Sequence, residues 1–470
     1  MVKFQALAVG ALLFGFVHSS PNSPSAPPLP ACPQPQLDNN VVVGNGNGVA
    51  GEQNILQGNQ NLVAGYTNGV AGHLNKVLGR ANKIFGSKNI ASGNGNGIVG
   101  NNNGAKGSAN TIIGSGNGVQ GDCNLLGGNA NKIEGSCNSI DGDANSLQGH
   151  LNTIANGNHN VVGGSQNTIH NGHYNGILGS ANFVSGSANG ISGDGNVVVG
   201  SGNGVDGSCN GINGHLNGVT GNGNGLQGSG NVVAGGENLV VGHKNGVKGN
   251  GNGVLGHKNK ALGHKNKIQG HNNKAIGHKH TIAGSNNLAV GINNSQLGNH
   301  NSAVGISNTQ IGNNHQVVGQ GNTQIGSHNS AQGNNNLAFG HGNKMAGNGN
   351  VGVGNLNLIA GTQNKALGNQ NLLAGKCNTA AGNDNTILGN NNLAIGSNNF
   401  LHGTSNLVSG HSNGVMGAGN LVLGSSNTIV SSYSGGGSLP LPPPPMLPSK
   451  PVQVCPAPQR NPTLKLNRKV

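Results

Sequence analysis

The sequence predicts an all-β fold, a parallel β-solenoid (a flattened β-roll) with two seven-residue repeats in each coil of about 14 residues. One observation is a repeat of Gly, two variable residues, Asn, a variable residue, a small apolar residue and a last variable residue. It runs from Gly44 to Gly424 in about 55 copies. Glycine also makes up 90 of the 470 residues, whereas aromatic residues are 2% and hydrophobic residues 33%. This composition is too poor in bulky apolar side chains for an ordinary globular core.

Each repeat is expected to form one short strand and one corner. In the copy Gly58-Asn-Gln-Asn61-Leu-Val63-Ala, Asn61 and Val63 are two residues apart and therefore point to the same side of a strand. The residues between and after them point outward. Glycine and the two residues that follow it turn the corner, because a positive φ is cheap only for glycine. Two strands and two corners close a coil, and coils stack at about 4.8 Å.

The asparagine of each repeat is predicted to form a column inside the solenoid. An amide side chain donates and accepts hydrogen bonds, so stacked asparagines can bond from coil to coil and to the corner backbone. His280 and His315 are the exceptions at this place. A period of about 14 inside the shorter one supports two repeats per coil. It is visible in Gln296, Gln310 and Gln324, which occupy the apolar position.

Two extra residues interrupt the repeat. Asn156 and Asn171 each lengthen a repeat by one residue, and they lie two repeats apart. With two repeats per coil, both insertions fall at the same corner of neighbouring coils. We therefore expect a bulge that is carried from one coil to the next.

The flanks differ in composition from the repeats. Residues 1–19 read as a secretory signal peptide, with Lys3, an apolar run to Val17 and small residues after it. Residues 20–37 form a Pro/Ser-rich linker, 38–430 the β-solenoid domain, and 431–470 a basic tail rich in Ser, Gly and Pro. The proline run in this tail is a spacer or a ligand for a proline-binding module. No later apolar run is long enough to cross a bilayer. We expect a secreted, extracellular protein without membrane insertion.

Several repeats resemble those of a known family. Asn160-Val-Val162-Gly-Gly and Asn182-Phe-Val184-Ser-Gly are similar to the Asn-x-Val-x-Gly repeats of plant ice-recrystallisation-inhibition (antifreeze-like) proteins. The longer form of that repeat is present as Asn152-Thr-Ile154-Ala-Asn-Gly157. The resemblance implies a left-handed parallel β-roll with about 14 to 15 residues per coil. It also implies a flat outward face that binds ice.

Ordered outward hydroxyl groups are local in this chain. The family usually has Thr or Ser directly after the asparagine, where this chain often has Gly, Leu or Lys. We predict that the ice- or surface-binding face consists of Ser295, Thr309 and Thr323 with the flanking Leu297, Ile311 and Ile325. The sequence Asn293-Asn294-Ser295 is a glycosylation sequon, and a glycan there would obstruct this face.

A second resemblance supports an alternative function. Asn287-Leu-Ala289-Val-Gly and Asn392-Leu-Ala394-Ile-Gly look like the head repeats of bacterial trimeric adhesins, with Asn where Ser is usual. This resemblance implies a structural or adhesive extracellular protein that self-associates or binds polysaccharide. The outward apolar residues that suggest lateral self-association are Val304, Ile311, Val318 and Ile325.

Charge is sparse and mostly basic, with 23 Lys and Arg against 10 Asp and Glu. Residues 242–280 predict a basic patch for an anionic polymer or surface, or a solvated edge that discourages aggregation. Metal binding by its histidines would lack supporting carboxylates or thiols. Base stacking would need more aromatic residues. We therefore expect no metal, no cofactor and no nucleic-acid partner. The patch consists of His243, Lys244, His257, Lys258, Lys260, His264, Lys265, Lys267, His271, Lys274, His278 and Lys279.

Catalytic arrangements do not stand out from the repeat. Neither a Ser–His–Asp set nor a carboxylate pair is recognisable, so we expect no enzyme activity. Cys123 and Cys137 occupy the same place in adjacent coils, which puts their α-carbons within disulfide range and predicts a bond. The other cysteines lack such a neighbour and are either free or link chains: Cys32, Cys209, Cys377 and Cys455.

Overall fold

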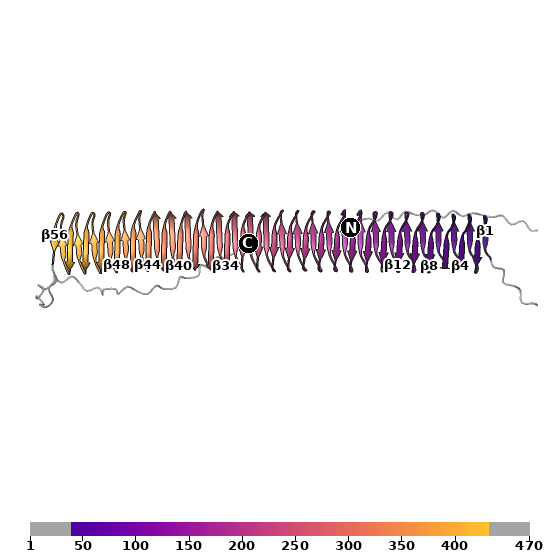
Figure 1. The fold of residues 1–470 in the computed structure, drawn as a ribbon, viewed down its shortest axis with the longest axis horizontal. Coiled ribbons are helices and arrows are strands. Elements are labelled where there is room, and N and C mark those ends of the chain that lie inside the picture. Colours follow the sequence, from indigo (N-terminus) through magenta and orange to yellow (C-terminus); the bar gives the residue numbers. More distant parts are fainter. Residues whose placement is uncertain (1–38, 432–470) are drawn as a thin grey trace, which may run out of the picture. The chain divides into compact units, whose positions relative to one another are not determined.

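A computed structural model describes residues 39–431, and within this range all regular secondary structure is β-strand. The predicted signal peptide, the linker and all of the basic tail after Ser431 lie outside the described residues. None of the described residues belongs to a helix long and apolar enough to span a membrane. The chain divides into two compact units. Figure 1 labels strands of both units. Unit 1 ends at Lys265 and unit 2 begins at Asn266.

Unit 1 contains strands β1 (Val41–Val43) to β32 (Lys260–Leu262). Each strand pairs in parallel with the strand two places further along the chain, so that β1 lies beside β3 (Ile55–Gln57). Odd-numbered strands therefore form one sheet, sheet A, and even-numbered strands form the opposite one, sheet B. The predicted parallel β-solenoid with two repeats per coil is confirmed.

Unit 2 contains strands β33 (Lys267–His271) to β56 (Thr428–Val430), with the same alternation between sheets A and B. Its strands are longer. Every even-numbered strand from β34 (Lys274–His278) to β54 (Gly414–Ala418) has five residues, whereas most strands of unit 1 have three. The additional pairing continues through the corner glycines, as between Gly305 and Gly319. Sheet B of unit 2 is consequently wider than either sheet of unit 1.

The asparagine column is the main hydrogen-bonded element of the interior. The Asn210 Oδ1 accepts bonds from the backbone N–H and the side-chain amide of Asn224, at 2.9 and 3.0 Å. The Asn210 amide in turn donates to the carbonyl of Gly221 at 2.8 Å and to Asn196 Oδ1 at 3.0 Å. Each fully buried amide of this column thus bonds to the coils on both sides. The predicted column is confirmed.

The corner carbonyls that accept these amide bonds also explain why each corner begins with glycine. Gly207 has a φ of 135°, and a Cβ on it would collide with the carbonyl oxygen of Gly221, which already accepts a bond from Asn210. The second residue after the corner glycine also has a positive φ, although it is often not glycine, as at Cys209 (60°) and Leu216 (55°). This left-handed residue was missed in the sequence, because only glycine marks such a conformation by composition.

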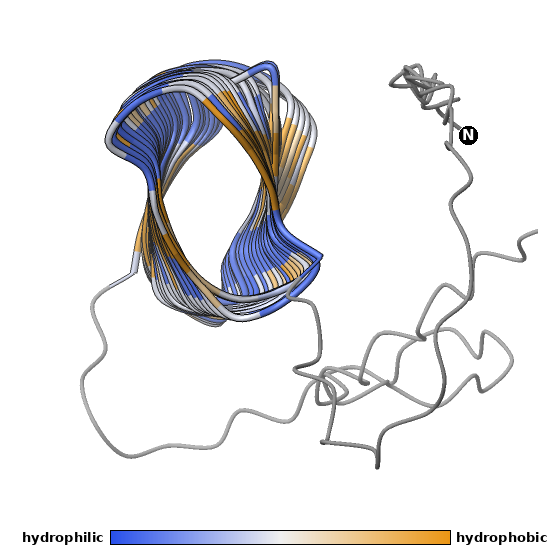
Figure 2. Cartoon of the chain, turned by 90° about the vertical axis from the view of Figure 1, so that its right-hand side faces the viewer, coloured by the Kyte–Doolittle hydropathy of each residue, from blue (hydrophilic) through white to orange (hydrophobic). Residues whose placement is uncertain are grey.

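The apolar residue of each repeat fills the space between the two sheets. Val205 and Ile212, from neighbouring strands of unit 1, have exposed fractions of 3% and 2%. Seen end-on in Figure 2, the two strands of a coil face each other and the corners are mostly hydrophilic. Because the column and these apolar residues use both inward positions, side chains that can reach a ligand lie on the outward positions and at the corners.

The two inserted residues lie where the sequence places them. Asn156 and Asn171 have φ values of 53° and 48°, and the Asn156 amide donates to Asn171 Oδ1 at 3.2 Å. They follow β17 (Thr153–Ala155) and β19 (Thr168–His170), which are paired neighbours in sheet A. The bulge carried between adjacent coils is confirmed.

Each histidine of the column accepts a backbone N–H of the next coil, as asparagine does, but its other ring nitrogen lies near a carbonyl four residues earlier in the chain. The buried His280 accepts the backbone N–H of Asn294 through Nδ1 at 3.2 Å, and its Nε2 lies 3.0 Å from the carbonyl of Ile276. His315 makes the equivalent pair of contacts with Asn329 and Ile311. Burial lowers the pKa of His280 and of His315. A ring that accepts through Nδ1 must be neutral, with its proton on Nε2.

Replacing one asparagine of the column should destabilise unit 1. Asn210→Ala removes the partners of the Gly221 carbonyl and of the Asn224 N–H, and each unmet buried group costs about 1–3 kcal/mol. We expect the free energy of unfolding, measured by urea titration, to fall by about 2–5 kcal/mol. The control is Asn213→Ala, an outward residue of the same strand, which should change it by less than about 0.5 kcal/mol. An equal loss of unfolding free energy in both variants would contradict a stabilising role for the asparagine column.

The neutral histidines should make folding sensitive to acid. Their folded pKa values are depressed, so the unfolded chain takes up protons first as the pH falls below about 6.5. Stability is then complete above that pH and is lost as the pH falls towards the folded pKa values. We expect the Tm of His280→Asn/His315→Asn to fall less than that of the natural protein between about pH 7.5 and pH 5.5. Parallel losses would contradict a role for these two rings.

Candidate functional site

A row of hydroxyl groups lies on sheet A of unit 2. Ser295 of β37 (Ser295–Leu297) is paired with Thr309 of β39 (Thr309–Asn313), which is paired with Thr323 of β41 (Thr323–Ser327). All three side chains are half-buried and point outward. The row repeats at the strand spacing, about 4.8 Å.

A row of apolar side chains runs beside the hydroxyl row. Leu297 is paired with Ile311, and Ile311 with Ile325, on the same three strands. The structure therefore brings together all six residues that the sequence singled out for a binding face. It also adds Thr281 of β35 (Thr281–Ser285), which is paired with Ser295. Thr281 precedes Ser295 by the same interval that separates the other hydroxyl residues, so it could have been identified from the sequence. We call these residues the Thr/Ile face: Thr281, Ser295, Leu297, Thr309, Ile311, Thr323 and Ile325.

A ladder of buried glutamines lies directly beneath the Thr/Ile face. The Gln296 amide donates to Gln310 Oε1 and to the carbonyl of Leu288, both at 2.8 Å. The Gln310 amide donates to the carbonyl of Ser302 at 2.9 Å. Leu288 and Ser302 belong to sheet B, so the glutamines bridge the two sheets behind the face. These bridges hold the outward rows in fixed positions.

A second hydroxyl row lies on sheet A of unit 1. Ser139 of β15 (Ser139–Asp141) is paired with Thr153, and Thr153 with Thr168. This row is not apparent from the repeat spacing, because the inserted Asn156 breaks the regular interval between the two threonines. Its flanking outward residues are Asp141, Ala155 and His170, so it carries charge where the Thr/Ile face has apolar groups.

The four apolar residues that suggested one lateral contact do not share a face. Ile311 and Ile325 lie on sheet A of unit 2. Val304 of β38 (Ser302–Ile306) and Val318 of β40 (Gln316–Gln320) lie on sheet B. The two pairs therefore point in opposite directions from the same coils. Sequence spacing gives the register of these residues, but the assignment of alternate strands to opposite sheets separates them.

The histidines of the predicted basic patch that belong to unit 1 lie at two corners. The rings of His243 and His257 stack at 5.1 Å with an interplanar angle of 4°. Lys244 and Lys258 follow them in the left-handed conformation. At the other corner His264 Nδ1 accepts the backbone N–H of Asn250 at 3.0 Å. The remaining members in this unit are Lys260, at the start of β32, and Lys265, after His264.

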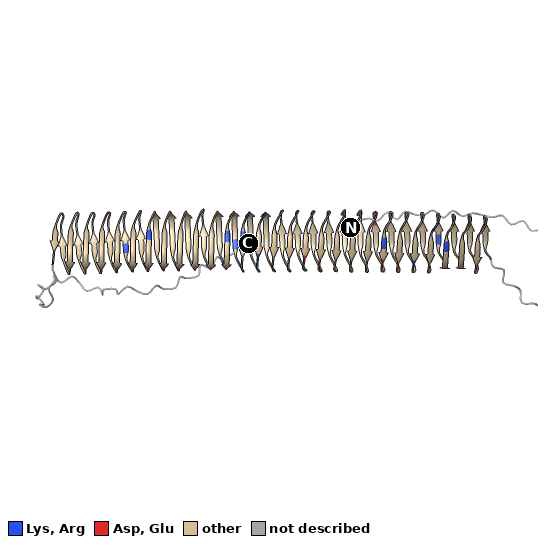
Figure 3. Ribbon diagram, viewed as in Figure 1, with Lys and Arg blue, Asp and Glu red and all other residues tan. Residues whose placement is uncertain are grey.

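The other basic residues belong to unit 2. Lys267 and His271 delimit β33 on sheet A, and Lys274 and His278 delimit β34 on sheet B, with Lys279 next to it. In Figure 3 the lysines are short blue segments on a mostly tan ribbon. Among residues 39–431 no group of three potential metal ligands is present. Binding of an anionic polymer by these lysines stays a prediction.

The corner histidines have a structural role that the sequence did not indicate. The first residue after a corner glycine commonly accepts the backbone N–H of its counterpart in the preceding coil. Asn101 accepts from Ser87 at 2.8 Å through Oδ1, and His243 accepts from Ser229 at 3.1 Å through Nδ1. Asn, Ser, Asp and His recur there because each offers an acceptor atom at a short reach.

Cys123 and Cys137 lie in successive coils as exposed free thiols. Partial desolvation and the neighbouring Cys137 thiol raise the pKa of Cys123. Cys209 is an exposed free thiol, and the Cys377 thiol donates to Gln363 Oε1 at 3.3 Å. Cys32 and Cys455 lie outside the described residues.

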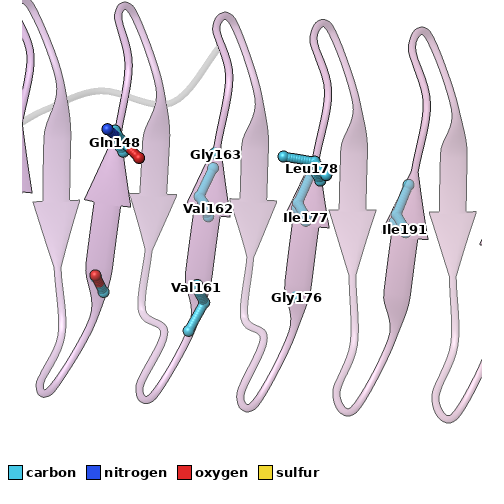
Figure 4. A pocket seen from close by; sticks show the side chains of 9 residues that line it. Gln148, Val161, Val162, Gly163, Gly176, Ile177, Leu178 and Ile191 are labelled. Atoms are coloured by element: carbon cyan, nitrogen blue, oxygen red, sulfur yellow. The ribbon is translucent and has the colours of Figure 1, made fainter.

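A shallow hollow of about 410 Å³ lies on sheet B of unit 1 (Figure 4). Gly163 and Gly176 form its floor between larger neighbours such as Val161 and Leu178. Its lining contains no acidic, basic or thiol side chain, so no general base is present there to activate the hydroxyl of Ser146.

Comparison with known proteins supports the resemblance found in the repeats. The family model described as the grass antifreeze beta roll matches residues 36–114 and 133–228. A search of curated proteins gives no match. The predicted similarity to ice-recrystallisation-inhibition repeats is thus confirmed. The second matched stretch contains the row from Ser139 to Thr168. Both stretches end before Lys265 and therefore lie outside unit 2, so neither contains the Thr/Ile face.

Oxidation should join Cys123 to Cys137. Adjacent coils stack at about 4.8 Å, which places the α-carbons of these two corner residues within the range of disulfides. Because the Cys123 pKa is raised, we expect the reaction with oxidised glutathione to be faster at about pH 9 than at pH 7. Peptide mapping should find the two cysteines linked within one chain, and Cys137→Ser should abolish the link. Glutathione on Cys209 with Cys123 and Cys137 still reduced would contradict this prediction.

Proposed function

We propose that this protein binds ice outside the cell and inhibits its recrystallisation, with the Thr/Ile face as the contact surface. The observation that carries the proposal is the match to the grass antifreeze beta roll over two stretches of repeats. The family match supports an ice-binding function. The choice of face and the extracellular location are inferences from this chain's own residues.

The Thr/Ile face has the properties that adsorption to a crystalline surface requires. Hydroxyl and apolar groups alternate across it and repeat once per coil, at about 4.8 Å. Threonine hydroxyls can hydrogen-bond to ordered water, while the adjoining methyl groups and isoleucine side chains release their hydration water on contact. The Gln296–Gln310–Gln324 ladder fixes the strands behind the face, so little conformational freedom is lost on binding.

The hydroxyl row of unit 1 is a weaker surface for the same function. It lies inside the family match, but Asp141 and His170 stand beside its serine and threonines. Ionisable groups keep a strong hydration shell that must be removed on contact with a solid surface. The Thr/Ile face carries no ionisable residue and extends over four successive coils from Thr281.

Charged substitutions should locate the contact surface. Thr309→Lys/Thr323→Lys inserts two ammonium groups into the face, and we expect recrystallisation inhibition by the full chain to fall about tenfold or more. The matched control is Leu393→Lys/Leu407→Lys, which changes the equivalent paired outward residues of β51 (Leu393–Ile395) and β53 (Leu407–Ser409) on sheet A, outside the Thr/Ile face. It should keep full activity. Crystal grain size at increasing protein concentration is the measurement.

Other outcomes of the same assay are equally informative. Normal crystal coarsening with the natural protein would contradict ice binding itself. Loss of activity in Thr153→Lys/Thr168→Lys, with Thr309→Lys/Thr323→Lys unaffected, would move the contact to the row in unit 1. Circular dichroism of each variant is needed to show that the β-structure is retained.

A further inference from the structure

The opposite side of the same coils carries an exposed apolar patch. On sheet B of unit 2, β36 (Leu288–Ile292), β38 and β40 present six aliphatic side chains to solvent. Ile292, Val304, Ile306 and Val318 have exposed fractions of 43, 39, 42 and 53%. We call these residues the aliphatic patch: Leu288, Val290, Ile292, Val304, Ile306 and Val318.

The fold itself does not require these side chains. Ile292 and Ile306 occupy the first corner position, where most repeats have Asn, Ser, Asp or His as a hydrogen-bond acceptor. Isoleucine cannot accept such a bond, and the two residues are instead paired at the ends of five-residue strands. An aliphatic side chain there gives up a bond and exposes apolar surface to water. Contact with another molecule would recover the free energy of that exposure.

From this surface we propose that two copies of the chain associate through sheet B of unit 2, with the Thr/Ile face left open to solvent. The aliphatic patch carries no charged side chain, and this favours a second copy of the chain over an anionic partner. The chain has a net charge of +13, so two copies repel each other wherever their lysines approach. The outward residues from β36 to β42 (Ser330–Asn334) contain no ionisable group.

The available area fits a weak, reversible dimer. The eight five-residue strands from β36 to β50 (Thr386–Asn390) cover about 600 Å² at the usual strand dimensions. Two such surfaces bury about 1,200 Å², the lower limit for specific interfaces. An antiparallel two-fold arrangement that places β36 over the partner's β50 uses all of this area.

This arrangement also matches the side chains. It places the aliphatic patch over β46 (Leu358–Thr362), β48 (Leu372–Lys376) and β50, whose outward residues include Leu358, Ala360, Leu372, Ala374 and Leu388. Lys344 and Lys376 stand at the ends of their strands, and their long side chains can reach water at the rim of the contact. The contact lies on the sheet opposite to the proposed ice face, so a dimer would present two such faces.

Sedimentation velocity on the full chain tests the proposal. The natural protein should shift from monomer to dimer between about 1 and 100 µM, and added salt should not weaken the dimer. Val304→Lys/Val318→Lys should remain monomeric over this range. The matched control, Leu297→Lys/Ile311→Lys, changes the equivalent paired positions of sheet A and should dimerise as the natural protein does.

The results separate this proposal from ice binding. A natural protein that stays monomeric at every concentration, or a dimer that survives in Val304→Lys/Val318→Lys, would overturn it. Dissociation of both variants alike would also overturn it, because the contact would then not depend on sheet B. Recrystallisation inhibition can persist in a monomer, so failure here leaves the ice-binding proposal standing. Retained circular dichroism in both variants confirms that the β-structure is intact.

Discussion

The bond from each ladder asparagine to the corner glycine of the following coil is the constraint on which the rest of this structure depends. Asn210 and Gly221 illustrate it, since the glycine carbonyl both accepts the asparagine amide and excludes any Cβ from Gly207. An apolar core this thin could not by itself order the backbone, whose conformational entropy costs about 1–2 kcal/mol per residue. The amide column supplies the additional interactions, and it does so only when coils are stacked.

The ladder also restricts where function can lie. Both inward positions of each repeat are occupied, and many first corner residues accept a hydrogen bond from the preceding coil. This acceptor role accounts in part for the corner histidines of the predicted basic patch. Free variation is left to the outward positions, which form two broad surfaces on opposite sides of each unit. A deep cleft would interrupt the asparagine column, so these two surfaces are the parts of each unit that a ligand can reach.

Unit 2 uses its two surfaces differently within the same coils. Ser295, Thr309 and Thr323 give sheet A a row of hydroxyl groups. Val304 and Val318 give sheet B an aliphatic surface. The buried glutamines between the sheets hold one surface at a fixed distance from the other. If sheet B joins two copies, each dimer exposes two of the proposed ice-binding faces, and simultaneous contact would raise the effective affinity for a crystal.

The sequence by itself determined the coil. The regular spacing of glycine, asparagine and an apolar residue allows little other than a stacked β-structure. It placed the column, its two histidines and the inserted Asn156 and Asn171 correctly. These features are local, because each depends on neighbours one coil away. The sequence also assembled the core of the Thr/Ile face, from Ser295 to Thr323, since its members share one register.

Only the tertiary structure decided which outward residues share a surface. Val304 and Ile311 look equivalent in the repeat, but alternate strands belong to opposite sheets, so they point apart. The row from Ser139 to Thr168 became visible only when the paired strands showed that the bulge restores the register. The sequence period determines what each residue does within its coil. The stacking of coils into two sheets decides which residues can meet a partner together.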